Sequence, residues 1–205
     1  MKTKKMLLSL ALILWSAVAW ADSPLTSTHF AQCYSDNAMV AMAQSLDGDL
    51  NTTLLNYLAD KKSPVAERLA IINAVGWNFD GKTTGAQLFE FLSKRYKAKD
   101  EKALAKKLDA GTLAVYAYAK AMSNYFDVND AMALAGMAVS KNKKKSFSVN
   151  LIAALIRTQY YLDNDWSMIY PIVNQVLNDG SLKLDMRQSA IDSIMEYIGI
   201  YEGEQ

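Results

Sequence analysis

The chain has 205 residues, 51% of them hydrophobic, and its formal net charge at pH 7 is +1. This length suits one domain or two small ones, and a charge near zero gives no global field that would attract nucleic acid or an anionic membrane. The single cysteine, Cys33, excludes an intrachain disulfide, so the fold has to be stable through packing alone.

The first 21 residues have the pattern of a secretory signal peptide. Three lysines precede an apolar run over residues 6–19, and the Ala-Trp-Ala sequence at 19–21 matches an A-x-A cleavage site. The run is shorter than the roughly 20 apolar residues of a spanning helix, and no basic cluster follows it. We therefore expect export, with the periplasm favoured and an extracellular location left open. Removal of residues 1–21 takes away three lysines and no acid, so the mature chain becomes slightly acidic.

The remainder of the chain predicts a single all-helical domain. It is rich in Ala, Leu, Met and Lys, which favour helices, and it lacks alternating β-branched runs. We expect residues 22–34 to form an N-terminal extension, residues 35–201 the helical domain and residues 202–205 a frayed tail. The mature chain should have no membrane span, because no later segment of spanning length is free of charge.

Capping residues predict where each helix starts. Two starts carry a capping box, formed by Thr84 with Gln87 and by Asp185 with Gln188, and Pro171 predicts a kink or a broken first turn. The fold class is therefore all-α, with about ten antiparallel helices arranged as stacked helical hairpins or as a compact bundle. In chain order the predicted starts are Ser35, Asp49, Ser63, Thr84, Asp100, Thr112, Asp127, Ser146 or Ser148, Asn164 or Asp165, and Asp185.

One segment resembles a known helical repeat. Residues 112–145 make up 34 residues, the length of one tetratricopeptide repeat. Counted from the first of them, Ala119, Ala131 and Ala138 occupy the eighth, twentieth and twenty-seventh positions, where that repeat places small residues between its two helices. The segment is similar to one degenerate tetratricopeptide unit, and the resemblance implies a concave protein- or peptide-binding surface and no catalysis.

The chain also departs from this repeat. Val115 and Met122 hold its aromatic positions, and Lys143 stands in place of its late proline. In the next 34 residues Ala153 fits the eighth position, but Asp165 falls at the twentieth, where a bulky charge does not fit. The resemblance therefore covers one unit and half of another, under a third of the mature chain.

No local motif predicts catalysis, a cofactor or a metal. A zinc site needs several His or Cys ligands, and the chain has one of each, His29 and Cys33. Their four-residue spacing is compatible with a thiol–imidazole pair, but the segment is expected to be a loop and Cys33 a small buried hydrophobe. Carboxylates contributed by distant segments leave a hydrolase as a remaining alternative, since such pairs have no local signature.

Two features predict a partner surface. Aromatic residues are dense in the C-terminal third, where Tyr161 and Trp166 are expected to lie off the core stripe. Lys143, Lys144 and Lys145 form the main concentration of charge, either as a contact for an acidic partner, phosphate or anionic lipid or as a solvated loop after a helix C-terminus.

These observations favour an exported, non-enzymatic helical protein that mediates protein or peptide interaction. The expected partner is another envelope protein or a peptide, and no nucleic acid is expected. The alternative function is binding of a small ligand or glycan through the C-terminal aromatic residues, with the hydrolase third. We expect no cofactor.

Overall fold

The computed structural model describes residues 23–46, 48–143 and 145–203. In this part of the chain the regular structure is helical, which confirms the predicted all-α class. The predicted signal peptide and Lys144 lie outside the described residues.

The α-helices are α2 (Ala38–Gln44), α3 (Thr52–Ala59), α4 (Val65–Val75), α5 (Thr84–Tyr96), α6 (Glu101–Lys107), α7 (Ala110–Ser123), α8 (Asn129–Lys141), α9 (Phe147–Leu162), α10 (Ile169–Leu177) and α11 (Gln188–Ile198). Three short 3₁₀ helices accompany them, η1 (Phe30–Tyr34), η2 (Trp166–Met168) and η3 (Gly199–Tyr201).

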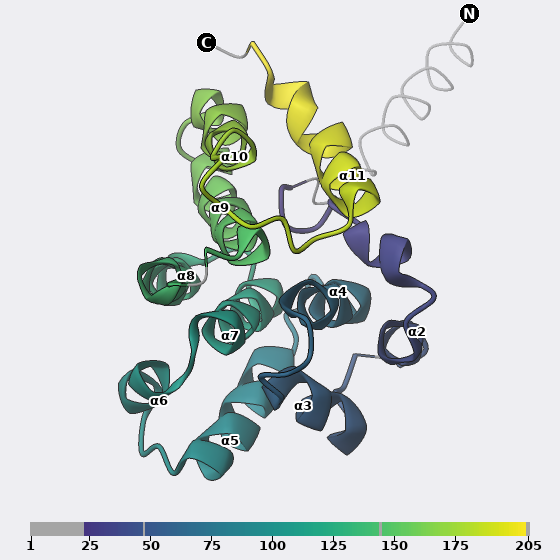
Figure 1. Ribbon diagram of the computed structural model, residues 1–205, viewed down its shortest axis with the longest axis vertical. Coiled ribbons are helices and arrows are strands. Elements are labelled where there is room, and N and C mark those ends of the chain that lie inside the picture. Colours follow the sequence, from purple (N-terminus) through teal and green to yellow (C-terminus); the bar gives the residue numbers. More distant parts are fainter. Residues whose placement is uncertain (1–22, 47, 144, 204–205) are drawn as a thin grey trace, which may run out of the picture.

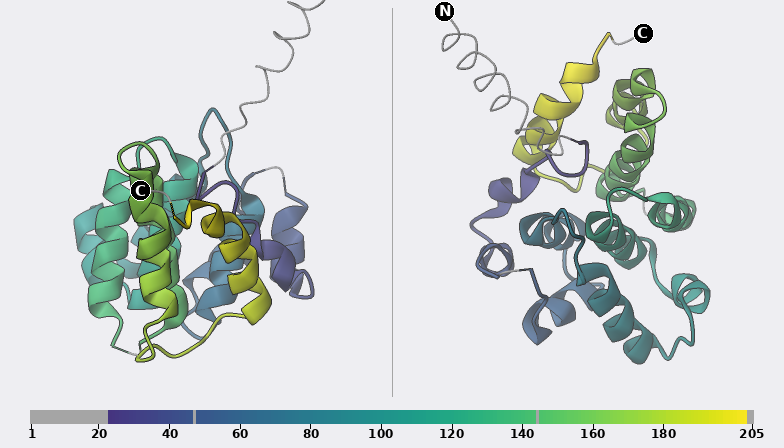
Figure 2. Two further views of the ribbon diagram at one scale, coloured as in Figure 1. Left: turned by 90° about the horizontal axis from the view of Figure 1, so that it is seen from above. Right: turned by 180° about the vertical axis from the view of Figure 1, so that it is seen from behind.

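The fold is organised around α7, whose sequence is apolar on all sides. Residues 111–119, 121 and 122 of this helix are all buried, as expected for a helix without a polar face. Helices α4, α5, α8 and α9 pack around α7, α10 packs on α9, and α11 packs on η1 (Figure 1). The two further views show the same arrangement from above and behind (Figure 2). Of the two predicted architectures, the compact bundle therefore describes the packing around α7.

Consecutive helices pair as hairpins in the second half of the chain. Helices α7 and α8 pack side by side, and so do α9 and α10. Ala119 of α7 and Ala131 and Ala138 of α8 are all buried, and small side chains of this kind allow helices to approach closely. The tetratricopeptide resemblance of this segment stays a prediction, because a single tight hairpin occurs in many helical folds.

Some of the predicted N-cap residues cap their helices in the structure, and other helices begin at different residues. Asp100 caps α6 and Ser146 caps α9, as the sequence predicts. Helix α2 starts two residues later than expected because its N-cap is Asn37, and not Ser35, and the Asn37 side chain accepts the amide hydrogens of Met39 and Val40. Helix α10 begins after the turn of η2. Pro171 therefore lies in its first turn, where no intrahelical amide donor is needed.

Both predicted capping boxes are wrong, because the residues concerned bind other segments. Helix α5 has no side-chain cap; instead the Gln87 amide accepts from the backbone of Leu50 at 3.0 Å and donates to Asp49 at 2.9 Å. Helix α11 also lacks a side-chain cap. The Asp185 carboxylate accepts hydrogen bonds from the backbone and hydroxyl of Ser148, each at 2.7 Å, and so caps α9 from a distant loop.

The N-terminal segment packs into the core. Leu25 and Phe30 are buried, and Phe30 stacks on Tyr118 of α7 with ring centroids 6.2 Å apart. Residues 23–34 therefore pack on the helical domain, with Leu25 and Phe30 in its core and His29 and Gln32 exposed. No helix in the described ranges is long and apolar enough to cross a membrane.

Replacement by alanine is expected to have opposite effects on stability at two glycines that lie within helices. A Cβ on Gly111 would lie 2.7 Å from Cγ2 of Val65 and 2.8 Å from Nη2 of Arg68, whereas a Cβ on Gly136 would meet nothing within 4 Å. We expect Gly111→Ala to lower the free energy of unfolding by about 1–2 kcal/mol through overpacking. Gly136→Ala should raise it by about 0.5–1 kcal/mol. Denaturant unfolding of both variants measures this, and equal stabilisation would show that α7 has free space at Gly111.

Candidate interaction surface

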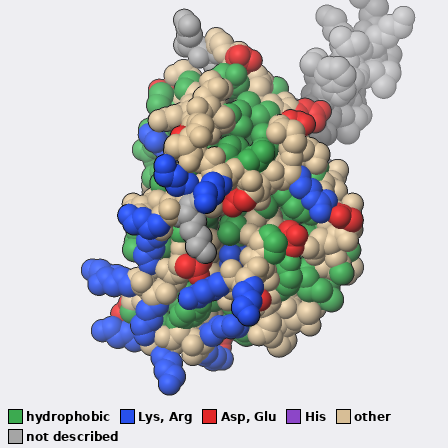
Figure 3. Space-filling model, viewed as in Figure 1, with side chains coloured by type: hydrophobic (Ala, Val, Ile, Leu, Met, Phe, Trp, Pro, Cys, Tyr) green, Lys and Arg blue, Asp and Glu red, His purple; other side chains and the backbone are tan. Residues whose placement is uncertain are grey.

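An open, partly apolar depression lies between α10 and α11, and we call it the α10–α11 cleft. Its volume is about 500 Å³. The two helices make few contacts with each other because α11 packs mainly on η1. Hydrophobic side chains gather between them in the upper half of the space-filling view (Figure 3). The lining residues are Phe147, Leu177, Asp179, Gly180, Leu182, Leu184, Gln188, Ile191, Asp192 and Met195.

The loop over residues 178–187 forms one wall of the cleft and is fixed at both ends of its extended part. Lys183 donates its backbone amide to the carbonyl of Lys145 at 2.7 Å, and its own carbonyl accepts from Phe147 at 3.0 Å. Asp185 binds Ser148 as described above. Because the backbone is held this way, Leu184 stays 62% exposed at the edge of the cleft.

The rim of the cleft is acidic. Hydrogen bonds from the hydroxyl and backbone of Ser181 lower the pKa of Asp179, with a smaller contribution from the positive charge of Lys145. Asp192 accepts one hydrogen bond, from Gln188 at 2.9 Å. The apolar floor is therefore flanked by two acidic side chains.

A second depression, which we call the α8–α10 groove, lies on the other side of α10. It has a volume of about 360 Å³ and shares Asp179 and Leu182 with the cleft. Its walls come from α8, α9 and α10, with Met132, Ala153 and Ile172 among the apolar residues. Together the cleft and the groove place apolar surface on both sides of α10, which is the arrangement expected of a site for an extended or helical segment.

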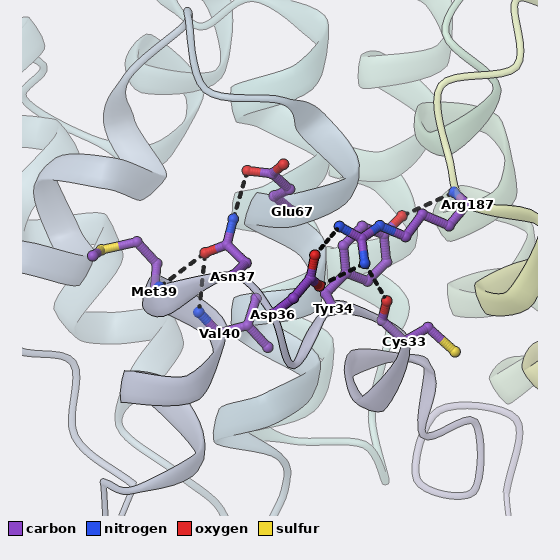
Figure 4. Close-up of polar contacts among 8 residues, drawn as sticks. All are labelled: Cys33, Tyr34, Asp36, Asn37, Met39, Val40, Glu67 and Arg187. Atoms are coloured by element: carbon purple, nitrogen blue, oxygen red, sulfur yellow. Dashed lines mark hydrogen bonds and ion pairs between the residues drawn. The ribbon is translucent and has the colours of Figure 1, made fainter.

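The C-terminal helix is held in place by a clamp on the N-terminal segment (Figure 4). The Arg187 guanidinium lies 4.5 Å from the ring centroid of Tyr34 and makes two hydrogen bonds with Asp36, at 2.6 and 3.0 Å. It also donates to the carbonyl of Cys33 at 2.7 Å. The hydrogen bond from Arg187 holds the pKa of Asp36 below its usual range. This clamp sets the position of α11 and therefore the width of the cleft.

The residues predicted to form a partner surface do not form one surface. Trp166 is 56% exposed, and its ring meets that of Tyr201 at 6.2 Å. Tyr161 is half-buried near the end of α9, beside Arg157, whose guanidinium lies 5.5 Å from the ring centroid. Lys143 and Lys145 are exposed before the start of α9. The 16 residues of α9 separate the two groups by roughly 24 Å.

The potential catalytic pair is not assembled in the described structure. His29 is exposed before η1, while Cys33 is half-buried and free. Among the described residues no group of three or more His, Cys, Asp or Glu side chains could hold a metal ion. The sequence reasoning missed Leu184 and Met195, although the alternation of Leu182 and Leu184 in a short segment before α11 is a signal for a half-exposed apolar edge.

Searches against protein-family models, curated proteins and solved structures find no match for this chain.

Proposed function

We propose that this is an exported, non-enzymatic protein that binds an apolar segment of a protein or peptide partner in the α10–α11 cleft. The observation that carries the proposal is the cleft itself, which is open, apolar and edged by Leu184 at 62% exposure. Leu184 adjoins the other apolar side chains that line the cleft, and a contiguous apolar surface of this kind is typical of an interaction site. Burial of Leu184 by a partner would contribute about 1.5–3 kcal/mol.

The chemistry of the rim defines the partner more closely. Asp179 and Asp192 flank a floor that includes Leu177, Ile191 and Met195. A fitting segment therefore carries apolar side chains for the floor and Lys or Arg beside them for the carboxylates. The cleft and the α8–α10 groove share Leu182, so an amphipathic segment of several turns can contact both sides of α10.

The cellular setting is part of the same proposal. Residues 1–21 have the charge, apolar run and cleavage-site pattern of a signal peptide, which supports export and favours the periplasm. The hairpin α7–α8 has the length and the small interface residues of a tetratricopeptide unit, which supports an interaction role.

Substitution of Leu184 tests the proposal directly. We expect Leu184→Asp to weaken partner binding at least tenfold, because it removes apolar contact and adds a third negative charge to the rim. The fold should be unaffected, since this side chain is mostly exposed. Ile200→Asp is the matched control: Ile200 is 57% exposed and is not part of the cleft lining.

The partner is identified by a photo-crosslinking amino acid placed at Met195, followed by titration of the purified partner segment. Crosslinks that disappear in Leu184→Asp and persist in Ile200→Asp support the proposal. Equal affinity of both variants for the purified segment would assign binding to another surface.

A second candidate function, glycan binding, is favoured by a different pocket. The loops that follow α4 and α7 enclose about 530 Å³, with Phe79 and Phe126 exposed at 70% and 60% and polar groups from Asn78 and Asp80. Aromatic faces beside amide and carboxylate groups suit a sugar ring. The predicted C-terminal aromatics instead contact one another, as in the hydrogen bond between Tyr197 and Tyr201. A change in Trp77 fluorescence on addition of a glycan would favour this alternative.

A further inference from the structure

One side of the molecule gathers lysine and arginine side chains from separate segments. Blue side chains cover the lower left of Figure 3, where α5, α6 and the end of α8 lie in Figure 1. We define as the basic strip nine exposed Lys and Arg residues at the end of α5, on α6 and in the loops after α3 and α8, leaving out Lys94, which pairs with Glu90 at 2.7 Å, and Lys107. They are Lys61, Lys62, Arg95, Lys97, Lys99, Lys102, Lys106, Lys143 and Lys145.

Specific contacts join these segments into one surface. The Nζ of Lys61, from the loop after α3, lies 5.7 Å from the ring centroid of Tyr96 at the end of α5. Lys107 of α6 donates to the carbonyls of Tyr96 and Lys97, both at 2.9 Å. The loop after α3, the end of α5 and the end of α6 are therefore neighbours.

The end of α8 joins the same surface. Lys141 donates from Nζ to the carbonyls of Ala105, Lys106 and Leu108, at 2.6, 3.0 and 2.7 Å. Lys107 and Lys141 thus stabilise the C-termini of α5 and α6, where carbonyls lack helical partners. A structural role explains these two lysines, and we leave them out of the strip.

The charges of the strip are poorly compensated. Residues 94–107 hold seven basic residues and two acidic ones, Asp100 and Glu101. Glu101 is directed at Lys120, with 2.8 Å between Nζ and Oε1. Within the described ranges the only ion pair that involves the strip joins Lys99 and Asp100, at 3.9 Å with both side chains exposed. The small net charge of the chain therefore hides a strongly positive side.

We infer that the basic strip binds the surface of an anionic phospholipid bilayer. Eight of its nine members are lysines, which act as hydrated point charges and lack the bidentate geometry that arginine offers to a specific carboxylate or phosphate. None of the four pockets described at the loops, α10 and η1 is lined by a strip residue. A broad, shallow positive surface fits an extended negative one, where each lysine adds attraction within a Debye length.

Nucleic acid is the other extended polyanion, and the composition of the strip argues against it. Single strands are bound by aromatic side chains on which bases stack. The large hydrophobic side chains with the greatest exposure, Phe79, Phe126, Leu184, Ile200 and Trp166, belong to loops or short turns outside the strip segments. No strip residue lines the cleft, so this inference does not depend on the proposed function.

Vesicle sedimentation tests the inference. The protein, in the form recovered from expressing cells, is mixed with vesicles of phosphatidylglycerol and phosphatidylcholine or of phosphatidylcholine alone. We expect binding to the anionic vesicles in 50 mM salt that is lost at 300 mM. Salt dependence separates this attraction from any insertion of the apolar run at residues 6–19. Salt-independent binding, or equal binding to phosphatidylcholine, would overturn the inference.

Charge variants locate the binding surface. The triple variant Lys99→Gln, Lys102→Gln and Lys106→Gln should bind the anionic vesicles about a hundredfold more weakly, since each lysine near such a surface contributes about fivefold. Replacement of the same three residues by arginine should keep the affinity within about twofold. Arg157→Gln, an exposed charge on α9 outside the strip, is the single-charge control for Lys102→Gln.

Two further outcomes decide against the inference. A triple glutamine variant that binds as well as the unaltered protein would assign vesicle binding to another surface. Binding of a 30-base-pair DNA duplex, with no binding of anionic vesicles under the same conditions, would assign the strip to nucleic acid. Circular dichroism of each variant confirms that only charge has changed.

Discussion

Replacement of Asn73 by alanine is expected to lower the free energy of unfolding by about 3–5 kcal/mol. The Asn73 amide joins three parts of the structure: its Oδ1 accepts from the backbone of Ala31 at 2.9 Å, and its Nδ2 donates to the carbonyl of Thr28 and to the hydroxyl of Tyr118, both at 2.9 Å. All of these residues are buried. Each buried group that loses its partner costs about 1–3 kcal/mol, and the alanine leaves three groups unpaired.

A loss of this size is a large part of the 5–15 kcal/mol typical of a domain. It should first release residues 23–34, which α4 and α7 hold through Asn73 and Tyr118. Denaturant unfolding measures the total effect, and limited proteolysis within residues 23–37 measures the local one.

The control for this variant is Tyr118→Phe. It removes one of the three bonds and keeps the ring that stacks on Phe30, so we expect a loss of about 1–2 kcal/mol. If Asn73→Ala cost no more than Tyr118→Phe, the N-terminal segment would be held by apolar packing, and the amide would not be its anchor.

The helices themselves could be predicted because their signals are local. Asp100 and Ser146 stand at the N-caps of α6 and α9, where their side chains accept hydrogen bonds from amides three residues ahead. The small residues Ala119, Ala131 and Ala138 predict a close pair of helices, and α7 and α8 do pack side by side. Patterns of this kind act within one or two turns and can be read from a single sequence.

Features that depend on distant segments could not be predicted. Gln87 binds Leu50, and Asp185 binds Ser148, 37 residues earlier in each case. Both look like helix caps locally, but a free carboxylate or amide takes whichever donors the fold places nearby. The α10–α11 cleft also escaped prediction, because its width depends on the packing of α11 against η1, far away in sequence.

The basic strip also depends on distant segments and could not be predicted for the same reason. Lys143 and Lys145 were visible as a basic run, yet the lysines that extend it come from the ends of α5 and α6. A near-neutral net charge predicted no attraction to anionic surfaces, because a sum over the chain contains no information about which charges lie side by side. The sequence predicts one partner surface for these lysines, Tyr161 and Trp166. The lysines precede the start of α9, whereas Tyr161 lies near its C-terminal end and Trp166 follows in η2.

A second large loss of stability is expected from truncation of Arg68. This is the largest fully buried side chain among the described residues, at 1% exposure. Its Nη1 donates to the carbonyl of Leu58 at 3.2 Å and to the hydroxyl of Thr112 at 3.0 Å, while its Nε has no hydrogen-bond partner. Burial lowers the pKa of the guanidinium, opposed by the negative charge of Asp109. We expect Arg68→Ala to cost about 3–5 kcal/mol through the cavity and the lost donors.

Methionine at the same position separates volume from charge. Arg68→Met fills most of the space with a flexible apolar chain and removes a charge whose desolvation is unfavourable. Its stability should therefore lie within about 1–2 kcal/mol of the unaltered protein. If both variants were equally destabilised, the hydrogen bonds to Leu58 and Thr112, and not the packing, would be what Arg68 contributes.

The pH midpoint of acid unfolding gives an independent measure of what the positive charge of Arg68 contributes to stability. Burial acts to raise the pKa of Asp109, but hydrogen bonds from Thr112 and the positive charges of Arg68 and Lys61 lower it overall. A carboxyl with a lowered pKa stabilises the fold above about pH 3.9, its unfolded value, and this contribution is lost as the pH falls through the folded pKa. In Arg68→Met the pKa of Asp109 rises because one positive charge is gone. The contribution of Asp109 is then smaller, and the midpoint of acid unfolding should move to higher pH. A midpoint that stays unchanged would mean that Thr112 and Lys61 set the pKa of Asp109 without Arg68, and that Arg68 stabilises the fold by its volume.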